Sequence, residues 1–117
     1  MKIKELLIGA FLFFTGQVIA WYQTNGQFIS PWIKQHPIIV SGIVGIPIGL
    51  FYIYGTTYIA EYSGGELWPV RIVGFVTGIL GFTLLTYIHL NEPVTLKTGV
   101  ILLLMTVIVL LQVFWRN

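Results

Sequence analysis

The polar side chains that could do chemistry in this chain are few, and one of them lies deep inside an apolar run. Gln17 belongs to the stretch LLIGAFLFFTGQVIAWYQ, residues 6–23. A carboxamide in hydrocarbon needs a partner for each of its polar atoms. Gln17 therefore has two open interpretations. It is a hydrogen-bonding contact between helices, worth about 1 kcal/mol or less, or it orients the polar part of a substrate.

A second group of polar residues lies in the run that follows. The spacing i, i+3, i+4 and i+7 puts its members on one face of a helix. These residues are Tyr54, Thr57, Tyr58 and Glu61. They could line a wet crevice, or they could hydrogen-bond to neighbouring helices, and the spacing alone leaves both open.

Glu61 and Arg71 are expected to face each other across a short turn, with Glu66 between them. One interpretation is an interfacial ion pair that helps to close a helical hairpin. The other is a gate or headgroup site, in which Arg71 attracts an anionic group and Glu61 holds Arg71 when the site is empty. No charged residue lies at the centre of any apolar run, where charges are costly and often functional.

Other kinds of chemistry lack the residues they need. The chain has no cysteine and no aspartate, so it has no thiolate nucleophile and no cysteine-based metal site. His89 and Glu92 have no second histidine or aspartate nearby at ligand spacing. No catalytic triad, phosphate-binding loop, zinc motif or pair of central carboxylates is present. We expect no enzymatic activity, no metal and no cofactor.

Composition indicates the environment in which these residues act. Of 117 residues, 56% are hydrophobic and 9% are charged, whereas soluble domains carry about 25% charged residues. A fold this small buries too little of its surface to hide so much apolar area. The lipid bilayer is therefore an expected partner. The net charge of +2 is too small and scattered for nucleic-acid binding.

Four apolar runs are long enough to cross a bilayer, which takes about 20 residues. We expect helices at about 5–22, 38–60, 68–89 and 95–115. The first run also resembles a signal peptide, since Lys2 and Lys4 precede it and small residues follow. We take it as a true span. The connections are short, so we expect one all-α, four-helix transmembrane domain over residues 1–117.

Small residues recur at helical spacing in the second and third runs. They form one row at Ser41, Gly45 and Gly49, and a second face at Gly74, Gly78 and Gly81. Such rows let helices approach closely, within a bundle or in a dimer. Arg71 shares the second face, which leaves another interpretation: a groove beside a basic residue, where a lipid or an amphipathic substrate lies.

The distribution of lysine and arginine predicts the orientation. Both termini and the second connection share one side of the membrane, which carries Lys2, Lys4, Arg71 and Arg116. The opposite side carries Lys34 and Lys97. Positive residues favour the cytoplasm, so we expect cytoplasmic termini. The bias is weak, and a small protein with a weak bias can insert both ways.

Two short motifs carry a resemblance to a known superfamily. Residues 16–20 read GQVIA, and residues 90–103 read LNEPVTLKTGVILL. With the spacing of the four runs, they resemble the four-helix members of the drug/metabolite transporter superfamily. The second motif is similar to the segment that opens the final helix there. The resemblance covers the whole chain and implies a four-helix membrane transporter.

Two groups within that superfamily are relevant. The small multidrug resistance proteins resemble this chain in length and exchange protons for drug cations through a glutamate in the first helix. This chain has Gln17 there, and glutamine cannot titrate. The flippase subunits that move lipid-carrier-linked sugars resemble it in the Gly16-Gln17 pair and in the Glu92-Pro93-Val94 segment. A four-helix group whose first helix ends in Ala-Trp-Tyr is also similar, through residues 20–22.

These observations lead to two functional hypotheses. The first is a small transporter or flippase-like protein for an amphipathic substrate, without a proton-carrying carboxylate in the first helix. Its candidate path residues are Gln17, Tyr54, Thr57, Glu61 and Arg71. The second is a non-transporting subunit of a larger membrane complex. Four short helices rarely enclose a path alone, so we expect a homodimer, parallel or antiparallel, or a heteromeric membrane partner.

Overall fold

The computed structural model describes residues 3–115 and is all-helical in that range. Its long helices are α1 (Ile3–Asn25), α3 (Pro37–Tyr62), α4 (Trp68–Leu90) and α5 (Leu96–Phe114). A 3₁₀ turn, η1 (Gly26–Phe28), and a short helix, α2 (Pro31–Gln35), connect α1 to α3. All four long helices are long and apolar enough to cross a membrane. The four expected long helices are confirmed, with ends close to those predicted.

Proline, glycine and asparagine set the helix ends. Pro37 is the first residue of α3 and Pro69 lies in the first turn of α4, where a missing N–H costs nothing. In the turn between these helices, Gly64 and Gly65 have φ of +70° and +95°, a region that side chains with a Cβ rarely adopt. Asn91 ends α4 in the left-handed conformation, with φ of 55°. The chain therefore reverses sharply after α3 and again after α4.

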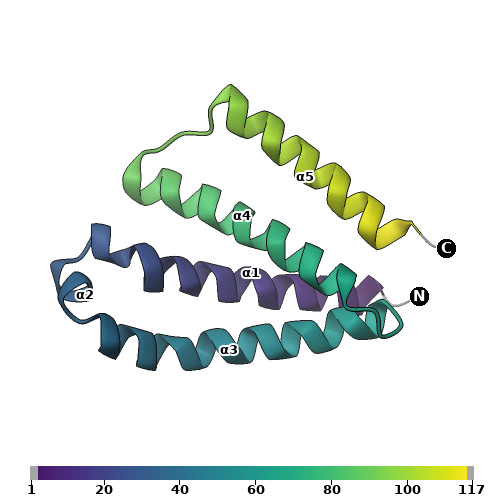
Figure 1. Cartoon of the computed structure of the whole chain (residues 1–117), viewed down its shortest axis with the longest axis horizontal. Coiled ribbons are helices and arrows are strands. Elements are labelled where there is room, and N and C mark those ends of the chain that lie inside the picture. The colour runs from purple at the N-terminus through teal and green to yellow at the C-terminus, as the bar shows by residue number, and fades with distance from the viewer. Residues whose placement is uncertain (1–2, 116–117) are drawn as a thin grey trace.

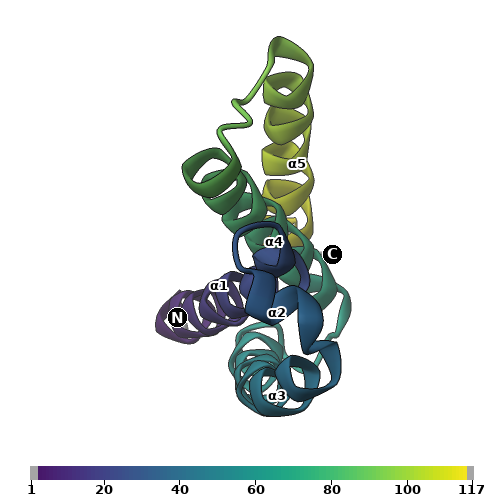
Figure 2. The same ribbon diagram turned by 90° about the vertical axis from the view of Figure 1, so that its left-hand side faces the viewer.

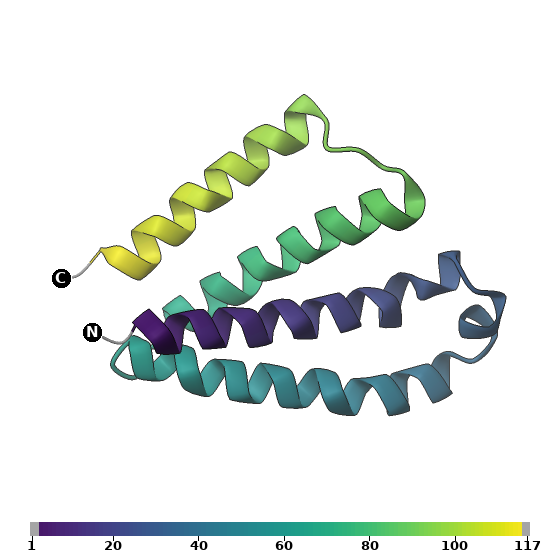
Figure 3. The ribbon, with the colours of Figure 1, turned by 180° about the vertical axis from the view of Figure 1, so that it is seen from behind.

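The helices lie side by side in the order α3, α1, α4, α5 (Figure 1). Because α1 packs between α3 and α4, it holds the other two together. Among the described helices, the backbone of α5 comes close only to that of α4, and the two diverge toward the 91–95 connection, as the view from behind also shows (Figure 3). The assembly is thin, 18 Å along its shortest axis (Figure 2).

Both ends of the described chain lie at the same end of the layer of helices. The α3–α4 turn lies at that end, while α2 and the 91–95 connection lie at the other (Figure 1). As a result, α1 and α4 run in the same direction, and α3 and α5 run opposite to them. Of the charges that predicted the orientation, Lys2 and Arg116 lie outside the described residues.

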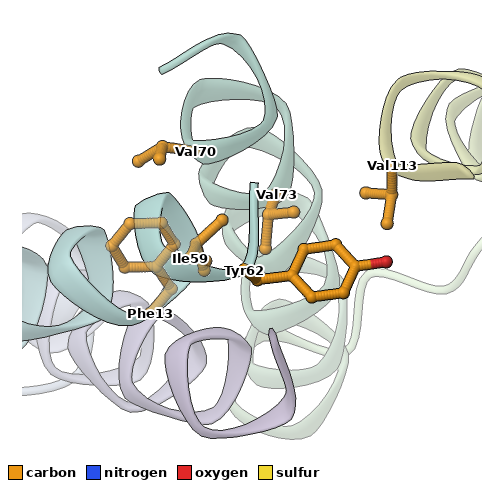
Figure 4. Packing of buried hydrophobic residues seen from close by; sticks show 6 residues of the cluster. All are labelled: Phe13, Ile59, Tyr62, Val70, Val73 and Val113. Atoms are coloured by element: carbon orange, nitrogen blue, oxygen red, sulfur yellow. The ribbon is translucent and has the colours of Figure 1, made fainter. Parts of the chain in front are cut away.

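The hydrophobic core lies toward the termini end of the layer (Figure 4). Its buried members come from all four long helices: Phe13, Ile59, Tyr62, Val70, Val73 and Val113. Ile59 is completely buried, and the Tyr62 ring extends toward Val113 of α5 (Figure 4). α5 is therefore joined to the other helices chiefly where α4 begins and α5 ends.

α1 and α3 approach each other closely at glycines that do not belong to either set of small residues predicted from the sequence. A Cβ built on Gly9 would overlap Ile59 and lie 3.0 Å from the carbonyl oxygen of Gly55. A Cβ on Gly55 would lie 3.2 Å from the carbonyl oxygen of Gly9. Only glycine at both positions lets the two backbones come this close.

Within residues 3–115, the row of Ser41, Gly45 and Gly49 makes no such approach. Its nearest neighbour is the side chain of Gln23, whose Nε2 lies 3.5 Å from the carbonyl oxygen of Ser41 and 3.6 Å from a Cβ built on Gly45. A Cβ on Gly49 would have no atom within 4 Å. A tight helix contact along this row would therefore require a neighbour outside this chain.

Candidate functional site: a groove beside Gln17 and Arg71

A groove of about 510 Å³ follows α1, α3 and α4. Its walls are mainly apolar and include Phe13, Val70, Phe75, Ile79 and Phe82. Polar side chains from all three helices also line it: Gln17, Tyr52, Thr56 and Arg71. A groove with this composition suits a molecule that has both a hydrocarbon part and a polar part.

The glycine face of α4 makes room for the groove. Arg71, Gly74 and Gly78 line it together, as their shared face predicts. A Cβ on Gly74 would lie 3.5 Å from the Phe13 ring, and a Cβ on Gly81 would lie 3.7 Å from the Cβ of Gln17. This glycine face therefore packs against α1 within the chain. The two interpretations left open for it, packing and a groove, both describe the structure.

Gln17 makes one side-chain hydrogen bond of the four that a carboxamide can make. Its Nε2 donates to the carbonyl oxygen of Gly74 at 3.2 Å, which joins α1 to α4. Its Oε1 accepts no hydrogen bond within residues 3–115. No enclosed side-chain nitrogen or oxygen in that range lacks a partner, so the Oε1 atom is accessible from the groove. Gln17 is thus a contact between helices and also offers a free acceptor.

Tyr52 and Thr56 add two hydroxyl groups from α3. Threonine hydroxyls in apolar helices usually bond to a carbonyl one turn back. Thr57 does so, donating to the carbonyl oxygen of Ile53 at 3.1 Å. Thr56 makes no side-chain hydrogen bond within the described chain, and neither does the hydroxyl of Tyr52. Both hydroxyls are therefore available to a bound molecule.

Arg71 brings a positive charge to the end of the groove where α4 begins. Its side chain is exposed, as is that of Glu61. The expected ion pair between them is not formed in the structure of residues 3–115, because no carboxylate oxygen lies within 4.0 Å of the guanidinium. The guanidinium can therefore bind an anionic group without first losing a protein partner.

The other expected path residues lie elsewhere on α3. Tyr54 lines a different groove, of about 460 Å³, together with Tyr58 and residues of α1. Thr57 is bonded to its own helix, and neither Thr57 nor Glu61 lines the groove that contains Gln17. The stripe from Tyr54 to Glu61 therefore does not line the groove of Gln17 and Arg71.

Tyr52 and Thr56 take the place of that stripe. Successive residues of a helix are rotated by about 100° about its axis, so side chains two residues apart, such as Tyr52 and Tyr54, point to nearly opposite sides. The i, i+4 spacing of Tyr52 and Thr56 is a signal of a polar face as clear as that of the predicted stripe. Nothing in the sequence indicates which of the two faces turns toward α1 and α4.

A polar and aromatic cluster ties α1 to α4 at the end far from Arg71. The buried indole of Trp21 donates from Nε1 to the hydroxyl oxygen of Thr86 at 3.0 Å. The hydroxyl of Tyr22 lies 2.7 Å from Nε2 of His89, and the His89 ring stacks on Trp21 with centroids 5.3 Å apart. This cluster fixes the spacing of α1 and α4 beside the groove.

The polar groups of the groove can bind a polar molecule. It contains a carboxamide, two hydroxyls and a guanidinium, with no carboxylate and no imidazole. Within residues 3–115, no three side chains of histidine, cysteine, aspartate or glutamate come together in a way that could hold a metal ion. The arrangement can bind the polar part of a molecule, and the guanidinium favours an anion.

Comparisons with protein-family models, curated proteins and solved structures gave no match to this chain. The resemblance to the drug/metabolite transporter superfamily stays a prediction from the two short motifs. What the groove can bind follows from its own geometry and chemistry.

Proposed function

We propose that this multi-pass membrane protein is a small transporter or flippase-like protein that moves an amphipathic molecule along the groove of Gln17 and Arg71. The observation that carries the proposal is the meeting of three uncommitted polar groups inside helices that are otherwise apolar. They are the Oε1 atom of Gln17 and the hydroxyls of Tyr52 and Thr56. Polar groups without partners are costly in hydrocarbon, and a bound polar head group would satisfy them.

The depth of these groups supports an amphipathic substrate with an anionic head. Arg71 lies near the start of α4, whereas Gly78, which touches Gln17, is about two turns further along. At 1.5 Å per residue, Gln17 lies about 10 Å deeper than Arg71. The guanidinium would attract the head group near the membrane surface, and the neutral groups would solvate it deeper in the bilayer.

Proton coupling through α1 is not part of the proposal. A buried glutamate can take up and release a proton near neutral pH because burial raises its pKa, but Gln17 has no such proton. The proposed movement is therefore either energetically downhill or driven through another part of an assembly. A homodimer remains our expectation for that assembly, and the unfilled row at Ser41, Gly45 and Gly49 offers a face for it.

Binding is tested first, with two single-chain amphiphiles of opposite charge. Purified protein in dodecyl maltoside is heated with dodecyl phosphate or with dodecyltrimethylammonium. We expect dodecyl phosphate to raise the unfolding temperature more, and Arg71→Ala to remove the difference. Lys97→Ala is the matched control, because it removes one positive charge outside the groove. Equal stabilisation by both amphiphiles, or an unchanged response in Arg71→Ala, would remove Arg71 from the site.

Movement is tested in vesicles that contain phosphatidylglycerol with a fluorescent head-group label. A reductant that cannot cross the membrane bleaches the outer leaflet, and continued bleaching reports passage of the inner lipid. We expect faster passage with the protein than in empty vesicles, and slower passage with Arg71→Ala. Passage no faster than in empty vesicles would count against movement of this class of substrate.

The second candidate is a non-transporting subunit of a larger membrane complex. It is favoured by the position of α5, whose backbone comes close only to that of α4 among the described helices and which leaves apolar side chains such as Leu103 and Leu104 exposed. Extraction in a mild detergent separates the candidates. A larger partner in fixed proportion would favour the subunit, and a homodimer alone would favour the transporter.

A further inference from the structure

A second cavity lies directly beyond Gln17. It has a volume of about 250 Å³ and is lined by Gln17, Ala20, Trp21, Thr24, Asn25, Gly78 and Phe82. Gln17, Gly78 and Phe82 also line the larger groove. The two spaces therefore meet at these three residues. Along α1 they extend from Gln17 in opposite directions, the groove to Phe13 and the cavity to Asn25, whereas on α4 both end at Phe82.

Together the two spaces extend over most of the thickness of a bilayer's hydrocarbon core. The groove reaches Arg71 at the start of α4, and the cavity reaches Asn25 at the end of α1. Since α1 and α4 run in the same direction, these residues lie at opposite ends of the layer (Figure 1). At 1.5 Å per residue along the helix axes, the distance from Arg71 to Gly78 and the distance from Gln17 to Asn25 add to about 22 Å. The hydrocarbon core of a bilayer is about 30 Å thick.

We propose that the groove and the cavity are two halves of one path across the membrane, and that the side chain of Gln17 closes the path between them. The inference rests on the proposed function, because it names how passage along that site is controlled. The Gln17 carboxamide fills the space beside Gly78, where a built Cβ would lie 3.0 Å from its Cδ and Nε2. One hydrogen bond, to Gly74, holds the carboxamide there, so rotation of an unbranched side chain opens the path.

The two halves differ in charge. The groove has the guanidinium of Arg71, whereas the cavity has only neutral polar groups. Several of those are already engaged: Trp21 donates to Thr86, Thr24 donates to the carbonyl oxygen of Ala20, and Asn25 donates to Thr24. An anionic head group is therefore held in the groove, and passing Gln17 is the step that takes it into the neutral half.

Gln17→Ala tests the closure, with Gln23→Ala as the matched control. Gln23 lies on the same helix and also donates from Nε2 to a carbonyl, that of Ser41, but lines neither space. Passage of labelled phosphatidylglycerol in vesicles should be about 2- to 12-fold faster in Gln17→Ala, the factor expected for loss of one hydrogen bond. Gln23→Ala should match the wild type.

Thr24→Trp tests the path if Gln17→Ala does not fold. A tryptophan there fills the cavity, so passage should fall at least tenfold while dodecyl phosphate still stabilises the protein. The control is Thr106→Trp on α5, an exposed position outside both spaces. Unchanged passage in Thr24→Trp, or no acceleration in folded Gln17→Ala, overturns the closure and leaves the proposed function standing. A wild type that neither binds dodecyl phosphate nor passes lipid overturns the proposed function itself.

Discussion

Gly9→Ala should destabilise the protein, because the methyl group has no space at the contact between α1 and α3. Its Cβ would overlap the side chain of Ile59, which is completely buried, and would lie 3.0 Å from the carbonyl oxygen of Gly55. Overpacking of this kind costs about 1–3 kcal/mol. Alanine regains up to about 1 kcal/mol of helix propensity over glycine. The middle of these ranges gives a net loss of about 1 kcal/mol of the free energy of unfolding.

Gly49→Ala is the matched comparison. It makes the same change within a helix of the same chain, but nothing lies within 4 Å of its Cβ. The variant should be as stable as the wild type or up to about 1 kcal/mol more stable. The difference between the two variants isolates the packing contribution, because the gain in helix propensity is common to both.

The assay is reversible unfolding in mixed micelles, in which sodium dodecyl sulfate replaces a mild detergent and helix content is followed by circular dichroism. Gly9→Ala should unfold at a lower fraction of dodecyl sulfate than Gly49→Ala, by an amount equivalent to about 2 kcal/mol. If the two variants unfold together, the close glycine contact between α1 and α3 does not exist in the folded protein. The packing described above would then be refuted.

Three further predictions concern the turn, the α1–α4 cluster and the orientation. Gly64→Ala should lower stability by about 1 kcal/mol in the same assay, because φ is +70° there; a neutral result would mean that the turn relaxes. Trp21→Phe should lower the free energy of unfolding by about 0.5–1.5 kcal/mol. A double-mutant cycle with Thr86→Val should show that the two effects are coupled, whereas additive effects would exclude the 3.0 Å hydrogen bond between these side chains. In intact cells an impermeant thiol reagent should label Gln27→Cys and not Glu66→Cys; partial labelling of both would instead indicate insertion in both orientations.

The sequence predicted the helices well because their limits depend on local chemistry. Long apolar runs are bounded by residues that stop or start helices, such as Pro37, Pro69 and the glycine pair after α3. The bilayer fixes the length of each run independently of what it packs against. The observed ends at Tyr62 and Leu90 therefore fall close to the expected ones.

The contacts between helices were harder to predict, because spacing defines a face without indicating its neighbour. The spacing of Gly74 and Gly78 left packing and a groove open as alternatives, and this face both packs against α1 and lines the groove with Arg71. On α3, in contrast, the sequence offered two polar faces and several glycines. The tight contact uses Gly55, and the groove uses Tyr52 and Thr56. In lipid both sides of a helix meet apolar surroundings, so hydrophobicity does not distinguish the inner face.

The peripheral position of α5 has a consequence for the order of assembly. Every residue that lines the groove or the cavity precedes Thr83. Chains fold from the N-terminal part as they are synthesised, so α1, α3 and α4 can dock while the last helix is still in the ribosome. The path would then be finished before α5 enters the membrane. A chain truncated after Leu90 should therefore keep the hydrogen bond from Gln17 to the carbonyl oxygen of Gly74.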